Sequence, residues 1–188
     1  MLNDKAPLEN KKSFNVYNGI KMKLKKNIKA PNFKLPSTNK NIFELNKIKN
    51  KNIILYFYPK DDTPGCTIES KDFSKLNNLI SKNNSIVLGI SKDSIKSHFK
   101  FKKKYKLKFD LLSDEKLSVI KKYGVWGKKS FLGKKYMGIV RTTFLINTKS
   151  KIHKIWSNVR VKDHANEVLK ELKNIWHYLL FRSKINDI

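Results

Sequence analysis

Residues 53–70 read IILYFYPKDDTPGCTIES, and this stretch decides the fold because it joins a strand to the start of a helix. The continuous apolar, β-branched and aromatic run 53–58 is typical of a strand buried on both faces, which belongs in the centre of a sheet. After Cys66 the apolar residues recur at helical spacing. Cys66 is therefore predicted in the first turn of a helix at the carboxyl end of a central strand, where open α/β sheets usually place their sites.

Strands and helices alternate on both sides of this stretch. Further strands are predicted at 30–36, 41–45, 85–90, 109–112, 138–147 and 151–158. Helices are predicted from Cys66 to about 80, from a Ser94 cap through Lys104, from an Asp114 cap to about 123, and over 165–180. This order predicts an α/β domain with a thioredoxin-like fold, in which helices flank a mixed central sheet.

The length of 188 residues suits one compact domain. Residues 1–29 are polar, lysine-rich and weakly patterned, so we expect an N-terminal arm before a domain over 30–188. A single cysteine excludes an internal disulfide and a cysteine-rich zinc site, and a reducing compartment fits best. With neither a signal-peptide pattern nor a long apolar run, we expect an intracellular protein without membrane association.

The chain carries a large excess of positively charged residues. Lysine and arginine number 42 against 15 acids, a formal net charge of +27. Such a field attracts polyanions, yet only three of the cations are arginines, which codon bias in an AT-rich genome would also produce. Electrostatic association with DNA or chromatin and a merely solvated lysine-rich surface are both open at this point.

The local sequence of Cys66 favours a reactive thiol over a buried structural cysteine. A thiol in the first turn of a helix faces unpaired backbone N–H groups and the positive end of the helix dipole. Both stabilise the thiolate, which is the nucleophilic form.

The pattern Pro59-x-x-x-Thr63-x-x-Cys66 resembles the active-site motif of the peroxiredoxins. The fuller segment 56–67 resembles that of the bacterioferritin-comigratory, or Q-type, branch, and the likeness extends over about residues 30–172. Companion segments in the same order are 30–36, 88–93, 111–115, 123–128 and 138–146. The resemblance implies a monomeric, thiol-dependent peroxidase that reduces hydrogen peroxide or small alkyl hydroperoxides without a metal or other cofactor.

The chemistry assigns roles close to Cys66, the expected nucleophile. The N–H groups of Gly65 and Cys66 can stabilise the thiolate and the charge on the leaving oxygen. The Thr63 hydroxyl can hydrogen-bond both thiolate and peroxide, although it could instead cap the helix. Pro59 would shield the thiolate from water, or simply end the strand.

Two charged residues complete the expected site. Arg141, placed here on the 138–147 strand, resembles the arginine that lowers the cysteine pKa and contacts peroxide; the alternative is a strand residue whose charged end reaches solvent. Glu69 resembles the acid that orients this arginine, against the alternative of a first-turn acid that complements the helix dipole.

Trp126 is expected in the core, and the histidines form no ligand-spaced pair, with two or more expected at surface positions on helices.

The chain departs from the branch at Lys71, where many members carry a second cysteine. It therefore resembles a one-cysteine variant, whose sulfenic acid needs thioredoxin, glutaredoxin or glutathione as an external thiol. The rival hypothesis is a basic chromatin- or nucleic-acid-associated protein in which peroxidase activity is secondary. Some eukaryotic members of the branch reside in the nucleus, which favours the nucleus over the cytoplasm here.

Overall fold

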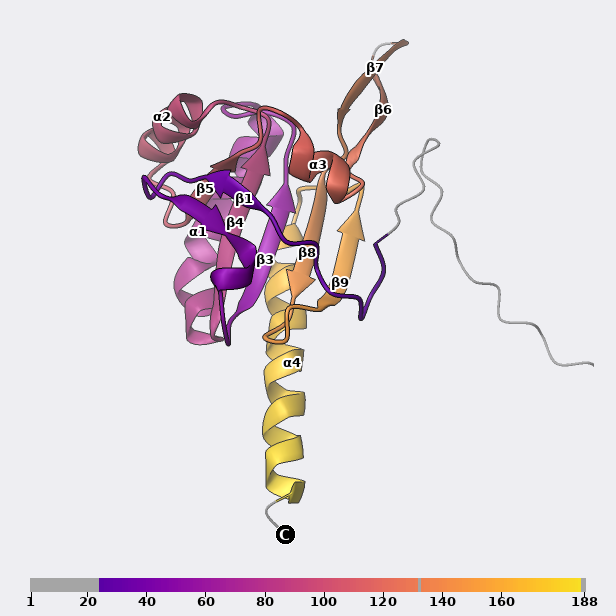
Figure 1. Ribbon diagram of the computed structural model, residues 1–188. Helices are drawn as coiled ribbons and strands as arrows, with labels where there is room; N and C mark the ends of the chain where they lie inside the picture. Colours follow the sequence, from indigo (N-terminus) through magenta and orange to yellow (C-terminus); the bar gives the residue numbers. More distant parts are fainter. Residues whose placement is uncertain (1–23, 132, 187–188) are drawn as a thin grey trace, which may run out of the picture.

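The computed structural model describes residues 24–131 and 133–186, which fold around a five-stranded sheet with the order β5-β4-β3-β8-β9 (Figure 1). The strands are β3 (Asn52–Phe57), β4 (Ser85–Ser91), β5 (Asp110–Ser113), β8 (Thr142–Ile146) and β9 (Ile152–Ser157). The β3, β4 and β5 strands are parallel, whereas β8 runs antiparallel to both β3 and β9. The predicted thioredoxin-like α/β fold with a mixed central sheet is confirmed.

The central strand β3 owes its place to its apolar sequence. Successive side chains of a strand point to opposite faces. Ile53 and Leu55 accordingly pack into one hydrophobic core, while Ile54 and Tyr56 pack into the other. Every residue of β3 is buried, so the strand needs a cover on both faces of the sheet.

Figure 1 shows how the two faces are covered. Helices α1 (Pro64–Lys82) and α4 (His164–Asn186) pack against each other on one face. The opposite face carries α3 (Ser118–Lys122) and the small antiparallel pair β1 (Lys34–Pro36) and β2 (Ile42–Glu44), which a 3₁₀ helix, η1 (Leu45–Lys47), follows. Helix α2 (Ile95–Tyr105) lies beside β5 at the edge of the sheet.

Both predicted capping side chains accept hydrogen bonds from N–H groups at a helix start, although the residue directly before α3 is Leu117 and not Asp114. The Ser94 hydroxyl accepts a hydrogen bond from Ser97 N at 3.3 Å and caps α2. The Asp114 carboxylate accepts from the N–H groups of Val119 and Ile120, each at 2.8 Å, in the first turn of α3. These side chains satisfy backbone donors that a helix start leaves unpaired.

The predicted strand over 138–147 is wrong, because two strands separated by a break occupy this region. Strand β7 (Lys134–Ile139) forms a hairpin with β6 (Trp126–Phe131), which the sequence analysis missed, and the hairpin projects from the sheet (Figure 1). In the break, Val140 N donates to Val125 O at 2.8 Å. The chain then leaves the hairpin for β8, so Arg141 lies between two strands and not on one.

Other predicted elements are present with shifted ends; β3, for example, begins and ends one residue earlier than expected. Trp126, expected in the core, is half-buried at its margin, where Lys92 Nζ lies 6.0 Å from the ring centre. No helix within residues 24–131 and 133–186 is long and apolar enough to cross a membrane.

The end of the predicted arm contacts β9. Asn27 N donates to Ile152 O at 2.7 Å, and Lys29 forms an isolated β-bridge with Lys151. Residues 1–23, the larger part of that arm, lie outside the described residues. The division of the chain at residue 29 stays a prediction.

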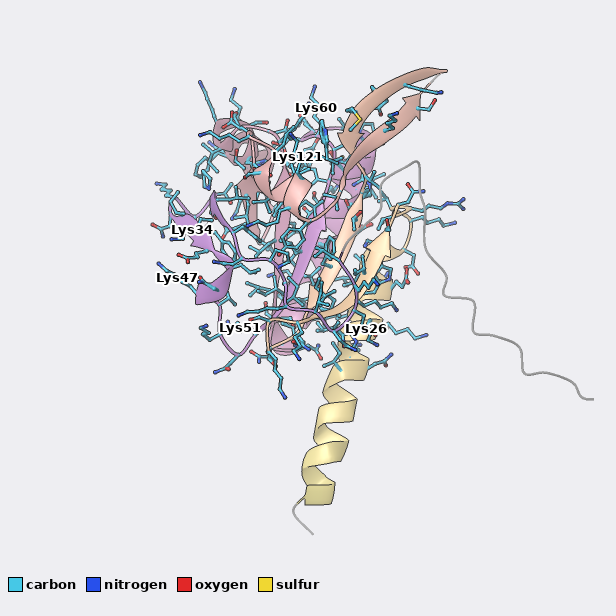
Figure 2. All side chains as sticks on the ribbon, turned by 45° about the vertical axis from the view of Figure 1, so that its right-hand side comes forward. Lys26, Lys34, Lys47, Lys51, Lys60 and Lys121 are labelled. Carbon is cyan, nitrogen blue, oxygen red and sulfur yellow. The ribbon has the colours of Figure 1, made fainter. Side chains whose placement is uncertain are left out.

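Lysine side chains extend from several sides of the domain, as Figure 2 shows. The exposed lysines labelled there are Lys26, Lys34, Lys47, Lys51, Lys60 and Lys121. Glu44 lies close to two of them, with Nζ–Oε2 distances of 3.2 Å to Lys34 and 3.6 Å to Lys47. The positive charge is therefore spread around the domain.

Candidate active site

Cys66 lies in the first turn of α1 and is only 1% exposed. Pro64 opens the helix, a position that suits proline because its missing N–H would have no partner there. The first helical hydrogen bond runs from Thr67 N to Thr63 O at 2.8 Å. The N–H groups of Gly65 and Cys66 precede it in the helix, and they belong to the turn that carries the thiol.

Arg141 reaches the same place from the other half of the chain. Its Nη2 donates to Cys66 Sγ at 3.2 Å, and its Nη1 donates to Glu69 Oε2. The register of the sheet explains this meeting, because Thr142 pairs with Phe57 at the end of β3 that leads to α1. The residue before β8 therefore lies beside the start of α1.

Glu69 lies one helical turn after Cys66 and is 1% exposed. Burial raises the pKa of Glu69 to about 7, although the charge and hydrogen bond of Arg141 act to lower it. Burial acts to lower the pKa of Arg141, but the electrostatic interactions and hydrogen bonds with Glu69 and Cys66 raise it on balance. The guanidinium is therefore a permanent cation held between a sulfur and a carboxylate.

The other predicted site residues lie on the loop between β3 and α1 and in the first turn of α1. The Thr63 hydroxyl donates to Lys60 O at 3.1 Å and makes no hydrogen bond that caps α1. Pro59 is half-buried just after β3. A Cβ atom at Gly65 would lie 3.6 Å from Arg141 Nη2, an ordinary van der Waals distance, so Gly65 lies directly beside the guanidinium. The structure brings Arg141 into direct contact with both Cys66 and Glu69, with Thr63, Pro59 and Gly65 on the adjoining loop and turn.

Lys129 is a charged residue near the site that the sequence analysis did not single out. It lies half-buried on β6, and its Nζ donates to Ile139 O at 3.3 Å, two residues before Arg141. Burial lowers the pKa of Lys129, the charge of Arg141 lowers it further, and Cys66 opposes both effects. No local sequence signal separates Lys129 from its neighbouring lysines, because only the hairpin brings it here.

His164 is a second residue that the sequence analysis missed. It is 3% exposed at the start of α4, and its Nε2 lies 2.8 Å from Thr143 Oγ1. The rings of Phe73 and Trp156 meet it edge-on, each with centroids 5.9 Å away. Burial lowers the pKa of His164 to about 4, with Glu167 opposing and Arg141 supporting the shift. The imidazole is thus neutral at physiological pH.

This buried imidazole predicts acid sensitivity. Between pH 6.5 and pH 4 the unfolded chain takes up a proton at His164 that the folded chain does not, so the free energy of unfolding falls as the pH falls. The total loss from this residue is about 3 kcal/mol. Urea unfolding from pH 7 to pH 4 should show this loss in the wild type relative to His164→Gln.

The comparison with His164→Gln is needed because protonation of Glu69 changes the free energy of unfolding in the opposite direction as the pH falls. Its raised pKa makes the folded chain bind the extra proton between pH 4.5 and about 7, so its contribution to stability falls as the pH rises through that range. Parallel pH profiles for the wild type and His164→Gln would contradict the assignment.

The prediction that two or more histidines occupy surface positions on helices is wrong, because His98 and His164 are 0% and 3% exposed and His153 lies on a strand. Hydrogen-bond partners inside the domain explain this burial: both ring nitrogens of His98 have one, and so does Nε2 of His164. His153 lies half-exposed on β9 beside Glu171, and the side chain of His177 lies outside the described residues. Among the residues that the structure describes, no group of three or more histidine, cysteine, aspartate or glutamate side chains could hold a metal ion.

Comparison with known proteins connects this geometry to one family. Residues 27–155 match the model of the AhpC/TSA family. The peroxiredoxin bcp of Coxiella burnetii is 50% identical over 144 residues, which cover 77% of this chain and 95% of that protein. Peroxiredoxin Bcp of Bacillus subtilis is 42% identical over 147 residues, 78% of this chain and 94% of that one. A crystal structure of a cysteine-to-serine mutant of Xylella fastidiosa PrxQ superimposes with a TM-score of 0.76 at 35% identity, over 80% of this chain and 96% of that chain.

The chain therefore belongs to the AhpC/TSA family, the class that its thioredoxin-like sheet and helix-start cysteine define. Within that family it is a homologue of the Bcp and PrxQ peroxiredoxins, and it is a thiol-dependent peroxidase. Its single cysteine fits a one-cysteine variant.

Proposed function

We propose that Cys66 reduces hydrogen peroxide and small organic hydroperoxides as a thiolate, with Arg141 as its main electrostatic partner. The observation that carries this assignment is the 3.2 Å contact between Arg141 Nη2 and Cys66 Sγ. A guanidinium at this distance stabilises negative charge on sulfur, and the nearby N–H groups of the helix start act in the same direction.

The proposed reaction moves charge from sulfur to oxygen. The Cys66 thiolate forms an S–O bond with one peroxide oxygen, the O–O bond breaks, and its electron pair leaves on the other oxygen. This oxygen takes a proton from solvent and departs as water or an alcohol, which leaves a sulfenic acid on Cys66. Arg141 and the Gly65 and Cys66 N–H groups can stabilise the departing anion.

Three neighbours are assigned supporting roles. Thr63 accepts a hydrogen bond from the bound peroxide, since its hydroxyl proton is donated to Lys60 O and its oxygen is not used to cap the helix. Pro59 limits the access of water to the thiolate from the β3 side. Glu69 orients the guanidinium through its hydrogen bond to Nη1. Because that bond leaves Nη2 directed at sulfur, Glu69 acts on the reaction through Arg141.

The sulfenic acid is then reduced by a thiol from another molecule. A first thiol forms a mixed disulfide with Cys66 and releases water, and a second thiol regenerates Cys66 and leaves as a disulfide. Thioredoxin, glutaredoxin and glutathione are the candidate reductants. Since Cys66 is 1% exposed, the first turn of α1 must open before a bulky thiol can reach its sulfur.

Intact-mass analysis after one equivalent of hydrogen peroxide tests the proposal. The wild type should gain one oxygen atom, and glutathione should then replace this species with a mixed disulfide before the starting mass returns. Lys71→Cys, at an exposed position of α1, should instead lose two hydrogen atoms as an internal disulfide forms. Five residues of continuous helix separate Cα atoms by about 7.5 Å along the axis, beyond disulfide range, so this product also requires α1 to open.

A wild-type mass that peroxide leaves unchanged would overturn the proposed reaction. Persistence of the added oxygen in the presence of every candidate thiol would contradict the external-thiol step alone. The two failures give different masses, so they are distinguishable.

The proposal covers neither DNA association nor the nucleus. The relatives reported above are bacterial peroxiredoxins, and they lend these two expectations no support. The lysines are also spread around the domain (Figure 2). We propose that the protein acts as a monomer, which rests on its resemblance to the Q-type branch.

A further inference from the structure

A buried carboxylate anchors the loop between β3 and α1. Asp61, five residues before Cys66, is 7% exposed. Its carboxylate accepts hydrogen bonds from Tyr58 Oη at 2.7 Å, from Ser97 Oγ at 2.7 Å and from His98 Nδ1 at 2.9 Å. The last two donors belong to α2, so this loop is attached to a different helix from the one it leads into.

His98 is fully buried between two hydrogen-bond acceptors. Its Nε2 lies 3.2 Å from Leu112 O, and a carbonyl oxygen can only accept, so this nitrogen donates. Its Nδ1 faces the Asp61 carboxylate, which already accepts from two hydroxyl groups. His98 therefore joins the Asp61 carboxylate on one side of its ring to the backbone of β5 on the other.

The backbone of the loop is held as firmly as this side chain. Asp61 N donates to Asp93 Oδ2 at 2.8 Å, and the same oxygen accepts from Ser91 Oγ at 2.6 Å. Ser113 Oγ donates to Asp93 O at 2.7 Å. The anchor of the loop therefore extends across the carboxyl ends of β4 and β5.

The loop that these hydrogen bonds hold has an unusual backbone conformation at Asp62. Asp62 has a φ of 56°, in the left-handed region that residues other than glycine rarely adopt. Such a conformation persists where the surrounding contacts impose it. Thr63 and the first turn of α1 follow directly, so the placement of the Thr63 hydroxyl and the Cys66 sulfur depends on how Asp61 is held.

We propose that Asp61 and His98 are positioning residues, which lock the loop before α1 so that Thr63 and Cys66 meet peroxide in the reactive geometry. The pair also sets how readily the first turn of α1 opens to expose the sulfur. The first part rests on the proposed function, because it concerns the reaction of Cys66 with peroxide. The second part concerns access to the thiol and can be measured without peroxide.

The adjacent Asp62 provides a matched control. Its carboxylate accepts from Lys104 Nζ at 2.6 Å and from the Tyr105 hydroxyl at 2.5 Å, so it also joins the loop to α2. The Asp62 and Lys104 side chains are 45% and 57% exposed, however, and exposed ion pairs contribute little. Asp62→Asn changes the same charge one residue away without touching the buried pair.

The experiment compares the wild type, Asp61→Asn, Ser97→Ala and Asp62→Asn. Two rate constants are measured for Cys66, one for oxidation by hydrogen peroxide and one for alkylation of the reduced protein by iodoacetamide. For Asp61→Asn we expect oxidation to be slower by about tenfold to a hundredfold, because small misplacements of reacting groups have effects of this size. Alkylation should become several times faster, because the sulfur spends more time exposed. Asp62→Asn should match the wild type in both rates.

Ser97→Ala provides a milder second variant in case Asp61→Asn does not fold. It removes one hydrogen bond to Asp61 from a half-buried helix position, and it should move both rates in the same directions by smaller factors. A purely structural role would leave both rates unchanged in folded protein. That result in Asp61→Asn and Ser97→Ala, or an equal effect of Asp62→Asn, would overturn the proposal. A wild type that peroxide does not oxidise would overturn the proposed function instead, while the alkylation rates would still test the anchor.

Discussion

Cys66→Ser should abolish peroxide consumption, with a fall in rate of more than about a thousandfold. A serine hydroxyl is a far weaker nucleophile than a thiolate at neutral pH, and Arg141 cannot change that order. The replacement is nearly the same size at a site that is 1% exposed, so the fold should persist. Peroxide consumption with excess glutathione is the measurement.

The control for this variant is Lys71→Ala, which changes an exposed residue on the same helix. It should consume peroxide at the wild-type rate. Residual consumption by Cys66→Ser comparable with that of the wild type would place the reaction at another group and remove the basis of the proposed function.

Arg141→Gln should slow the oxidation of Cys66 by roughly a hundredfold to a thousandfold, the usual effect of losing one preorganised donor from a reacting centre. The variant loses the cation that lies 3.2 Å from sulfur, and it leaves Glu69 buried without its positive partner. Arg141→Lys should give an intermediate rate, because a single ammonium group does not reproduce the planar fork that contacts sulfur and carboxylate together. The second-order rate constant for oxidation can be measured by quenching the reaction at different times and determining the intact mass of the protein.

Arg160→Gln is the matched control, since Arg160 is an exposed arginine that follows β9. It removes the same net charge from the protein while leaving the site unchanged. If both variants slowed oxidation equally, the general positive field and not the contact with Arg141 would control the reaction.

The candidate-site residues whose location the sequence could predict are close together in the chain. Thr63, Cys66 and Glu69 lie on one loop and the first turns of one helix, so strand pattern, proline and helical spacing place them together. Arg141 lies 75 residues from Cys66, and only the resemblance to a known family connected the two. Its expected position on a strand was wrong, because the apolar residues of 138–147 read as one continuous strand, whereas the break between β7 and β8 depends on the hydrogen bonds from Val140 N to Val125 O and from Val159 N to Arg141 O.

The parts that the sequence did not predict depend on tertiary contacts. His98 and His164 lie on helices, where a lone histidine is usually exposed, but partners from other elements satisfy each ring inside the domain. Asp61 looks like one of two equivalent turn acids in the sequence. The structure separates it from Asp62 by burial, which follows from the position of α2.

The pairing of β3 with β8 has a consequence for how this enzyme gains its activity. The partner β4 follows β3 after a single helix, whereas β8 joins only after most of the domain has been made. Contacts between distant segments cost more loop-closure entropy and tend to form late. A chain that has folded only as far as α1 and β4 would have Cys66 in its helix but no Arg141 beside it. Peroxide reduction therefore requires the complete sheet, and the cysteine motif alone is not enough.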